Sequence, residues 1–190
     1  MRRSREDALE TRRRIVETAA KLFRARGIAR VSVADVVGAL GLTVGAFYRH
    51  FESKDLLVAE AIEAASIETA ARQDAMAPGE GVGERRAALL GAYLSKQHKD
   101  HPGRGCPVAA LAAEMAHESL SSKKAFTRAL DRLLCTLESI VPGDAKEDRQ
   151  RRLRSAAALV GALVLARSTS DERRAAEVLA AVRESPDLRS

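Results

Sequence analysis

The fold is decided by the stretch Gly41-Leu42-Thr43-Val44-Gly45-Ala46-Phe47-Tyr48-Arg49-His50-Phe51-Glu52-Ser53-Lys54. Gly41 is a helix stop, because glycine readily adopts the left-handed backbone that ends many helices. Thr43 and Ser53 are helix N-caps, since their hydroxyl groups accept hydrogen bonds from free backbone N–H groups. We therefore expect a short helix that ends near His50, followed by a second, long helix.

Another short helix is expected just before this stretch. Ser32-Val33-Ala34-Asp35 has the spacing of a capping box, with Asp in place of the usual Glu. Apolar residues then repeat at helical spacing up to the Gly41 stop, at Val33, Val36, Val37 and Leu40. Two short helices joined by a turn that contains glycine have the arrangement of a helix-turn-helix.

A longer helix is expected from Thr11 to a glycine stop at Gly27, with residues 1–10 charged and frayed. Its apolar positions form one stripe, at Ile15, Ala19, Leu22 and Phe23. Basic residues occupy the other faces of this helix, among them Arg12, Arg13 and Arg14. The stripe should face a core and leave the arginines at the surface.

The excess of positive charge is confined to the first quarter of the chain. The 190 residues contain 32 Lys plus Arg and 26 Asp plus Glu, a net charge of +6. Residues 1–50 hold 11 of the basic and 5 of the acidic residues, so the remaining 21 and 21 leave residues 51–190 neutral. This asymmetry indicates an anionic partner, either nucleic acid or a membrane surface. The first helix offers a membrane only Ile15, Leu22 and Phe23, so nucleic acid is favoured.

The helix expected before Phe51 offers a docking surface. Val44, Phe47 and Phe51 share one face by their spacing and should anchor this helix in a small core. The other face presents side chains to a partner, namely Gly45, Ala46, Arg49 and His50, with Tyr48 at its border. The arginine guanidinium can pair bidentately with guanine in the major groove. The tyrosine hydroxyl and the Lys54 ammonium can hold phosphates.

Residues 41–51 with Ser53-Lys54-Asp55 closely resemble the helix-turn-helix signature of TetR-type (tetracycline-repressor-like) transcriptional regulators, and the resemblance covers residues 11–57. It implies an all-α fold of about nine helices. A helix-turn-helix DNA-binding domain would occupy residues 1–52, and a ligand-binding and dimerisation domain residues 53–190. The implied function is that of a repressor, a homodimer that binds a palindromic operator in double-stranded DNA and is released by a small-molecule inducer.

The resemblance also implies which residues contact DNA. Contacts in the major groove would come from Thr43, Gly45, Ala46, Arg49 and His50. Contacts with the DNA backbone would come from Ser32, Tyr48, Lys54, Arg12, Arg13 and Arg14. The family's usual Lys, Arg or Pro in the recognition helix is replaced here by Val44, which removes one DNA contact.

Residues 53–190 are also expected to be helical. The chain is 46% hydrophobic but only 3% aromatic, with no Trp, which favours close-packed helices over sheets. Breakers such as the cluster at residues 78–83 separate expected helices over 54–77, 84–99, 107–118, 121–140, 147–168 and 171–184. The longest apolar run, residues 156–166, is shorter than the about 20 residues that span a bilayer. We therefore expect a soluble, cytoplasmic protein.

The last two helices are expected to form the dimer interface. Residues 155–166 are apolar all round, and small side chains there allow a close helix approach. The predicted interface residues are Ala158, Gly161, Ala162 and Leu165 in the first of these helices, and Val178, Leu179 and Val182 in the second. The alternative is that both helices pack wholly within one subunit.

Two cysteines suit a reducing compartment. Cys106 precedes Pro107, so it should be a helix N-cap, where the helix dipole and nearby Arg104 would activate its thiol. One hypothesis is therefore a repressor that senses oxidants or electrophiles through Cys106. The simpler interpretation is a small buried cap residue, and Cys135 among leucines is expected in the core.

No other chemistry is indicated. A metal site could draw on His98, His101, Cys106, Glu114 and His117, but their spacing is not that of a metal motif, so no metal or cofactor is expected. Tyr93, Met115 and Phe126 could line a ligand pocket, but large apolar residues at helical spacing are more often plain core, so we assign none of them to a pocket. The chain has neither a G-x-S-x-G nor a P-loop motif, so we do not expect an enzyme.

Overall fold

The computed structural model describes residues 5–76, 81–143, 145–185 and 188. Within these residues all regular structure is helical, which confirms the expected all-α class. The helices are α1 (Arg5–Arg26), α2 (Val33–Gly38), α3 (Val44–Phe47), α4 (Lys54–Asp74), α5 (Val82–Tyr93), α6 (Lys96–Asp100), α7 (Pro107–Leu111), α8 (Leu120–Glu138), α9 (Lys146–Ser168) and α10 (Glu172–Arg183), with two short 3-10 helices, η1 (Pro102–Arg104) and η2 (Met115–His117).

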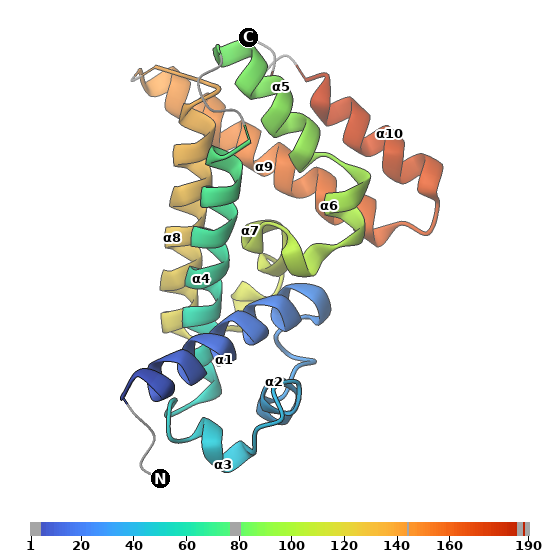
Figure 1. Ribbon diagram of the computed structural model, residues 1–190. Coiled ribbons are helices and arrows are strands. Elements are labelled where there is room, and N and C mark those ends of the chain that lie inside the picture. Colours follow the sequence, from blue (N-terminus) through green and yellow to red (C-terminus); the bar gives the residue numbers. More distant parts are fainter. Residues whose placement is uncertain (1–4, 77–80, 144, 186–187, 189–190) are drawn as a thin grey trace.

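Helices α1, α2 and α3 form a small unit at one end of the molecule (Figure 1). Both glycine stops expected from the sequence have a left-handed backbone, with φ of 87° at Gly27 and 68° at Gly41. The capping box at the start of α2 is formed, because the Ser32 hydroxyl accepts from the Asp35 N–H while the Asp35 carboxylate accepts from the Ser32 N–H. These local signals fix the order helix, turn, helix.

Helix α4 joins this unit to the rest of the molecule. It begins against α1 and then runs side by side with α8 (Figure 1). Ser53 caps its start by accepting a hydrogen bond from the Leu56 N–H at 3.2 Å. Its buried residues lie on more than one face, as expected for a helix with neighbours on two sides, and include Leu57, Val58, Ala61, Ile62 and Ala65.

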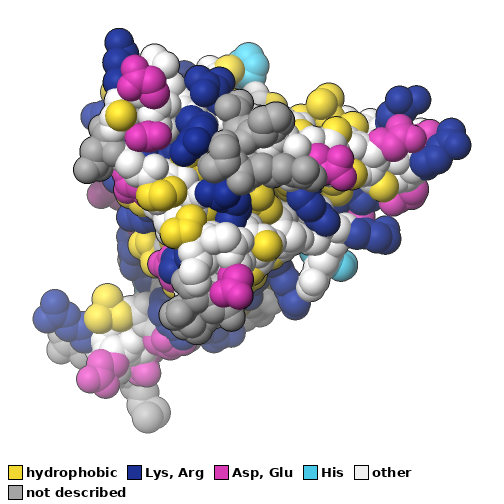
Figure 2. Space-filling view, turned by 90° about the horizontal axis from the view of Figure 1, so that it is seen from above, with side chains coloured by type: hydrophobic (Ala, Val, Ile, Leu, Met, Phe, Trp, Pro, Cys, Tyr) yellow, Lys and Arg dark blue, Asp and Glu magenta, His cyan; other side chains and the backbone are white. Residues whose placement is uncertain are grey.

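The other helices complete a body around one continuous apolar core. Helix α9 packs on α7, α8 and α10, and α7 lies between α1 and α9. Figure 2 views the end of the body away from α1–α3 and shows Lys and Arg side chains interspersed with Asp and Glu. In the part of the chain that the structure describes, no helix is both long and apolar enough to cross a bilayer.

Several boundaries differ from those expected. Helix α1 begins at Arg5 instead of Thr11, because Glu6 and Asp7 in its first turn suit a helix N-terminus. The single helix expected over 84–99 is two helices, since the Ser95 hydroxyl caps α6 by accepting from the His98 N–H at 3.0 Å. The expected helix over 107–118 divides into α7 and η2. Of the breaker cluster at 78–83, residues 78–80 lie outside the described residues.

Cys135 is exposed, so its expected place in the core was wrong. The buried residues around it on α8 are Leu133, Thr136 and Leu137. Residues two positions apart on a helix point in different directions, so Cys135 lies off the face that Leu133 and Leu137 share.

Candidate nucleic-acid interface

Helix α3 is short and closely capped. The Thr43 hydroxyl accepts a hydrogen bond from the Ala46 N–H at 3.2 Å, which confirms Thr43 as the N-cap. The helix spans Val44–Phe47, and its C-cap is Tyr48, so it ends three residues before the expected end at His50. Tyr48 and Arg49 therefore lie in the turn that follows the helix.

One aromatic pair anchors α3. Phe47 is fully buried, and its ring stacks on that of Phe51 with centroids 5.3 Å apart. Val44 was expected on this buried face but is 42% exposed. The correction follows from the length of α3, because Phe51 lies beyond the helix and the spacing of Val44 and Phe51 no longer defines one helical face.

The residues predicted to form a docking surface lie on the solvent side of α3 and in the turn that follows it. Gly45, Tyr48 and Arg49 are exposed, and Ala46 and His50 are partly exposed. A Cβ added at Gly45 would meet only the Thr43 hydroxyl oxygen, at 3.9 Å, so the backbone here is open to close approach. Among the described residues, no ion pair or hydrogen bond holds the Arg49 guanidinium. These residues form the α3 surface, defined as Thr43, Gly45, Ala46, Tyr48, Arg49 and His50.

The three consecutive arginines of α1 have different surroundings. Arg12 makes a bidentate ion pair with Glu60 of α4, at 2.6 and 2.5 Å, and its guanidinium lies 4.4 Å from the centroid of the Phe51 ring. Arg13 pairs with two acidic residues of its own helix, Glu10 and Glu17. Arg14 is exposed and has no ion pair with the described residues. Of the three, Arg14 is the best placed to pair with a partner, although its charge also lowers the pKa of Glu10.

Lys54 and Ser32, predicted to hold the DNA backbone, both have partners within the protein. The Lys54 ammonium donates to the Ile28 carbonyl oxygen at 2.7 Å and lies 5.9 Å from the centroid of the Phe23 ring. The Ser32 hydroxyl donates to the Asp35 carboxylate at 2.5 Å, and this bond lowers the pKa of Asp35. Lys54 thus ties α4 to the segment between α1 and α2.

Two residues, neither of which the sequence predicted in this role, connect this unit with the body. Glu114, just before η2, accepts a hydrogen bond from the Ala29 N–H at 3.1 Å. Arg24 on α1 is buried, and it donates to the Gly105 carbonyl oxygen at 2.8 Å and pairs with Glu68 of α4 at 3.0 Å. These contacts join residues 44 to 85 positions apart, so no local pattern could reveal them.

The body contains a pocket of about 670 Å³, within the usual range for small-molecule sites. It lies between α4, α5, α6 and the loop before α7. Its lining residues are Thr69, Arg72, Gln73, Met76, Leu89, Ala92, Tyr93, Ser95, Gln97, His98, His101, Arg104, Gly105 and Cys106. The pocket wall at Gly105 also receives the hydrogen bond from Arg24, so this loop touches α1 directly.

His98 holds this wall together. Its Nδ1 lies 2.7 Å from the Tyr93 carbonyl oxygen, and its Nε2 accepts from the Cys106 N–H at 3.0 Å. Burial, together with the charges of Arg167, Arg72 and Arg24, lowers the pKa of His98 to about 4, so the ring is neutral at pH 7. A Cβ at Gly105 would overlap this ring, which explains the glycine there.

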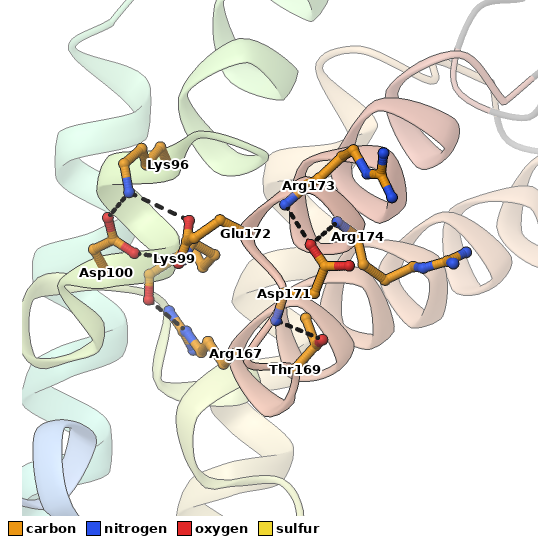
Figure 3. A network of polar contacts seen from close by, with 9 residues as sticks. All are labelled: Lys96, Lys99, Asp100, Arg167, Thr169, Asp171, Glu172, Arg173 and Arg174. Carbon is orange, nitrogen blue, oxygen red and sulfur yellow. Dashed lines mark hydrogen bonds and ion pairs between the residues drawn. The ribbon is translucent and has the colours of Figure 1, made fainter.

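Arg167 links the same wall to the C-terminal helices. Its guanidinium donates to the carbonyl oxygens of His98 and Lys99, at 2.6 and 3.1 Å. Figure 3 shows the surrounding network, in which Lys96 and Lys99 of α6 pair with Glu172 at the start of α10. Helix α6 is thereby fixed to the α9–α10 connection.

Cys106 is the N-cap residue of α7, as expected, and it is buried. Its side chain makes no capping hydrogen bond, and Pro107 follows as the first helical residue. The candidate metal ligands do not converge: within the described residues, no group of three His, Cys, Asp or Glu side chains could hold a metal ion. Glu114 instead holds the Ala29 N–H.

The C-terminal helices leave an apolar face uncovered. Leu165 is 60% exposed, and Leu153, Ala157, Gly161 and Val164 lie with it along one side of α9. Among the predicted interface residues, Ala158, Val178 and Val182 are also partly exposed. Ala162 and Leu179 are buried within the subunit and pack in its own core, so a second copy could reach only the others.

A capped, anchored short helix with an open outer face, following two helices and a turn, defines a helix-turn-helix protein. Residues 15–61 match the model of the TetR family, described as "Bacterial regulatory proteins, tetR family". Residues 15–61 thus form an N-terminal domain of the TetR type, as the sequence resemblance predicted.

Relatives of known description resemble this domain. The chain is 47% identical over 58 residues to the HTH-type transcriptional regulator TtgR of Pseudomonas putida, and 37% identical over 59 residues to the probable acrEF/envCD operon repressor of Escherichia coli. These segments cover 30% and 31% of this chain, and 28% and 27% of the relatives.

Solved structures share the whole fold. The reduced form of Escherichia coli NemR has a TM-score of 0.77 at 20% identity and covers 92% of this chain and 93% of that chain. A TetR transcriptional regulator from Chloroflexus aurantiacus has a TM-score of 0.73 at 26% identity, with 94% of this chain and 92% of that chain covered. The helical body therefore has the same architecture as TetR-type structures.

Proposed function

We propose that this protein is a transcriptional repressor that binds double-stranded operator DNA through the α3 surface. The observation that carries the proposal is the exposed Arg49 that follows α3, close to the open backbone of Gly45 on a helix anchored by the buried Phe47. Because Gly45 and Ala46 have small side chains, the backbone of α3 can approach the edges of the bases closely. The Arg49 guanidinium can then make two hydrogen bonds to a guanine. Arg14 and Tyr48 supply contacts with phosphates, and Lys54 orients the unit as well as adding charge.

The repressor acts as a homodimer on a palindromic operator. The support is the uncovered apolar face of α9, since Leu165 and its neighbours would be shielded from water by the same face of a second copy. The unit formed by α1, α2 and α3 is called the head below. Two heads related by a twofold axis match the two half-sites of a palindrome. Residues 1–52 form the DNA-binding domain, and residues 53–190 form the domain that dimerises and binds a ligand. As a regulator of bacterial genes, the protein acts in the cytoplasm.

A small-molecule inducer bound in the 670 Å³ pocket releases the DNA. The route of coupling is short, because the Gly105 carbonyl in the pocket wall holds Arg24 of the head. A ligand that displaces this loop would shift α1 and the start of α4, and so change the spacing of the two α3 surfaces. Since coupling between sites is reciprocal, operator DNA would weaken inducer binding by the same factor.

The test is DNA binding by the full chain. Duplexes are selected from a random library, and affinity is measured by fluorescence anisotropy. We expect a palindromic site, and Arg49→Ala should weaken binding by about 1–3 kcal/mol and relax the preference at one or two positions. Arg149→Ala removes an exposed arginine of α9 and serves as the control. An unchanged sequence preference in Arg49→Ala would refute direct readout by this residue.

A second candidate is a repressor that senses oxidants or electrophiles through Cys106. The observation that favours it is the position of Cys106 in the pocket wall, where its N–H is held by His98. Mild hydrogen peroxide should then weaken DNA binding by the natural chain and by Cys135→Ser, but not by Cys106→Ser. Retained sensitivity of the Cys106→Ser variant would exclude this mechanism.

A further inference from the structure

The charged residues in the described lining of the pocket are basic. Its described lining includes Arg72, Arg104, His98 and His101 but neither Asp nor Glu. The lining residue Arg72 lies 3.8 Å from the carboxylate of Glu68, which is itself paired with Arg24 at 3.0 Å. Because a cationic ligand would find no counter-charge among these lining residues, the lining favours an anion.

Arg104 is the side chain that is free to bind this anion. It is exposed at the pocket, and none of the described residues makes an ion pair or hydrogen bond with its guanidinium. The backbone of Arg104 is held by Arg72, whose Nη2 donates a hydrogen bond to the Arg104 carbonyl oxygen at 2.7 Å. A guanidinium pairs with a carboxylate through two parallel hydrogen bonds, which gives both affinity and orientation.

Part of the pocket lining is apolar. Met76, Leu89, Ala92 and the ring of Tyr93 line it, and Leu89 and Tyr93 are buried. The Tyr93 hydroxyl is buried too, and the Cys106 side chain is its polar neighbour among the described residues. Burial and the neighbouring Cys106 raise the pKa of Tyr93, so this hydroxyl keeps its proton and stays a donor.

We infer that the pocket binds an organic carboxylate with an apolar ring or chain, whose carboxylate pairs with Arg104 and whose apolar part lies against Leu89 and Tyr93. This ligand class rests on the proposed function, in which the pocket takes the inducer. Burial lowers the pKa of His98, so this ring is neutral at pH 7 and adds no charge of its own to the pocket.

The experiment compares matched ligands on the full chain. A naphthalene carboxylate, the neutral carboxamide and naphthylmethylammonium have the same apolar part, and decanoate and decylammonium repeat the comparison with a chain. Binding is measured by isothermal titration calorimetry. We expect the carboxylates to bind at least about 10-fold more tightly than their neutral or cationic counterparts, since the charged hydrogen bonds are lost in those.

Two variants locate the effect. Arg104→Gln should remove the preference for the carboxylates, and Arg149→Gln, which changes the same charge outside the pocket lining, should keep it. The inference is overturned if the amide or ammonium compounds bind as tightly as the carboxylates, if Arg104→Gln behaves like Arg149→Gln, or if no compound of either series binds.

A DNA arm separates this inference from the proposed function. Selected duplexes are titrated with and without each compound. Release of DNA by the ammonium compounds would overturn the anion assignment and leave the repressor intact. Absence of sequence-specific DNA binding without any compound would refute the proposed function, whichever compound the pocket prefers.

Discussion

Arg24 on α1 donates a hydrogen bond to the backbone carbonyl oxygen of Gly105 in the pocket wall, at 2.8 Å. Arg24 is buried, and its guanidinium also pairs with Glu68 of α4 and donates to the Ala20 carbonyl oxygen. One side chain thus touches the head, the connecting helix and the pocket loop. Its burial lowers the pKa of Arg24, a sign that this position has lost contact with bulk water.

Arg24→Gln should uncouple the pocket from DNA. We expect the free energy of unfolding to fall by about 1–3 kcal/mol, because buried hydrogen bonds are lost while half-exposed Glu68 stays solvated. Urea denaturation measures this fall, and the ratio of DNA affinities with and without an effector measures the coupling. Arg26→Gln, an exposed arginine of the same helix, is the control. An effector response equal to that of the natural chain would show that coupling takes another route.

The salt dependence of DNA binding should distinguish the neighbouring arginines of α1. Arg14→Ala should make the slope of log affinity against log salt shallower by about 0.9, because an unpaired charge releases one counterion on binding a phosphate. Arg13→Ala should change the slope less, since Glu10 and Glu17 already neutralise that guanidinium. The slopes are measured by anisotropy titrations at several salt concentrations. Equal changes in the two variants would contradict this assignment.

His98 should make the protein sensitive to moderately acidic pH. Its pKa is lowered in the folded chain to about 4, from an ordinary value of 6.5, so between these values the unfolded chain takes up a proton that the folded chain does not. Stability from this group is complete above pH 6.5 and falls as the pH drops towards 4, by about 3 kcal/mol in all. Urea denaturation across this range measures the fall. His98→Gln should flatten the profile, whereas exposed His117→Gln should not; a profile unaltered by His98→Gln would argue against the assignment.

The dimer should depend on the uncovered face of α9. Leu165→Glu places a charge where the second copy would exclude water, which should weaken dimerisation by about 3–5 kcal/mol. Sedimentation equilibrium measures the association. Leu120→Glu, at a leucine of α8 that is 68% exposed, controls for the loss of an exposed leucine. A natural chain that sediments as a monomer, or a Leu165→Glu variant that still dimerises normally, would count against this interface.

Local signals made much of the head predictable. The glycine stops, the capping box and the caps at Thr43 and Ser53 depend on neighbouring residues only, and the structure confirms each of them. The face of α3 was harder, because the place of Val44 depends on where the helix ends. Cys135 was misplaced for a related reason, since leucines on both sides of a residue in a helix do not bury it.

The pocket and the head contacts could not be predicted in this way. In the sequence, Arg24 does not differ from the other basic residues of α1. It differs in the structure, because it contacts the Gly105 carbonyl oxygen and Glu68, which are far away in the sequence. Lys54 was expected to bind a phosphate, but its ammonium group donates a hydrogen bond to the Ile28 carbonyl oxygen. Such pairings are set by how helices far apart in sequence pack. Neither the amino-acid composition nor the spacing of apolar residues predicts these pairings.

The arginines that connect the pocket wall to the rest of the molecule bind backbone oxygens. Arg24 holds the carbonyl of Gly105, Arg72 that of Arg104, and Arg167 those of His98 and Lys99. A carbonyl oxygen is present whatever side chain its residue carries, so substitutions of Arg104 or Lys99 leave these attachments in place. Ligand preference and signal transmission are therefore separable in evolution: a descendant of this protein could come to recognise a different molecule through new side chains in this loop and still pass the response to its DNA-binding head.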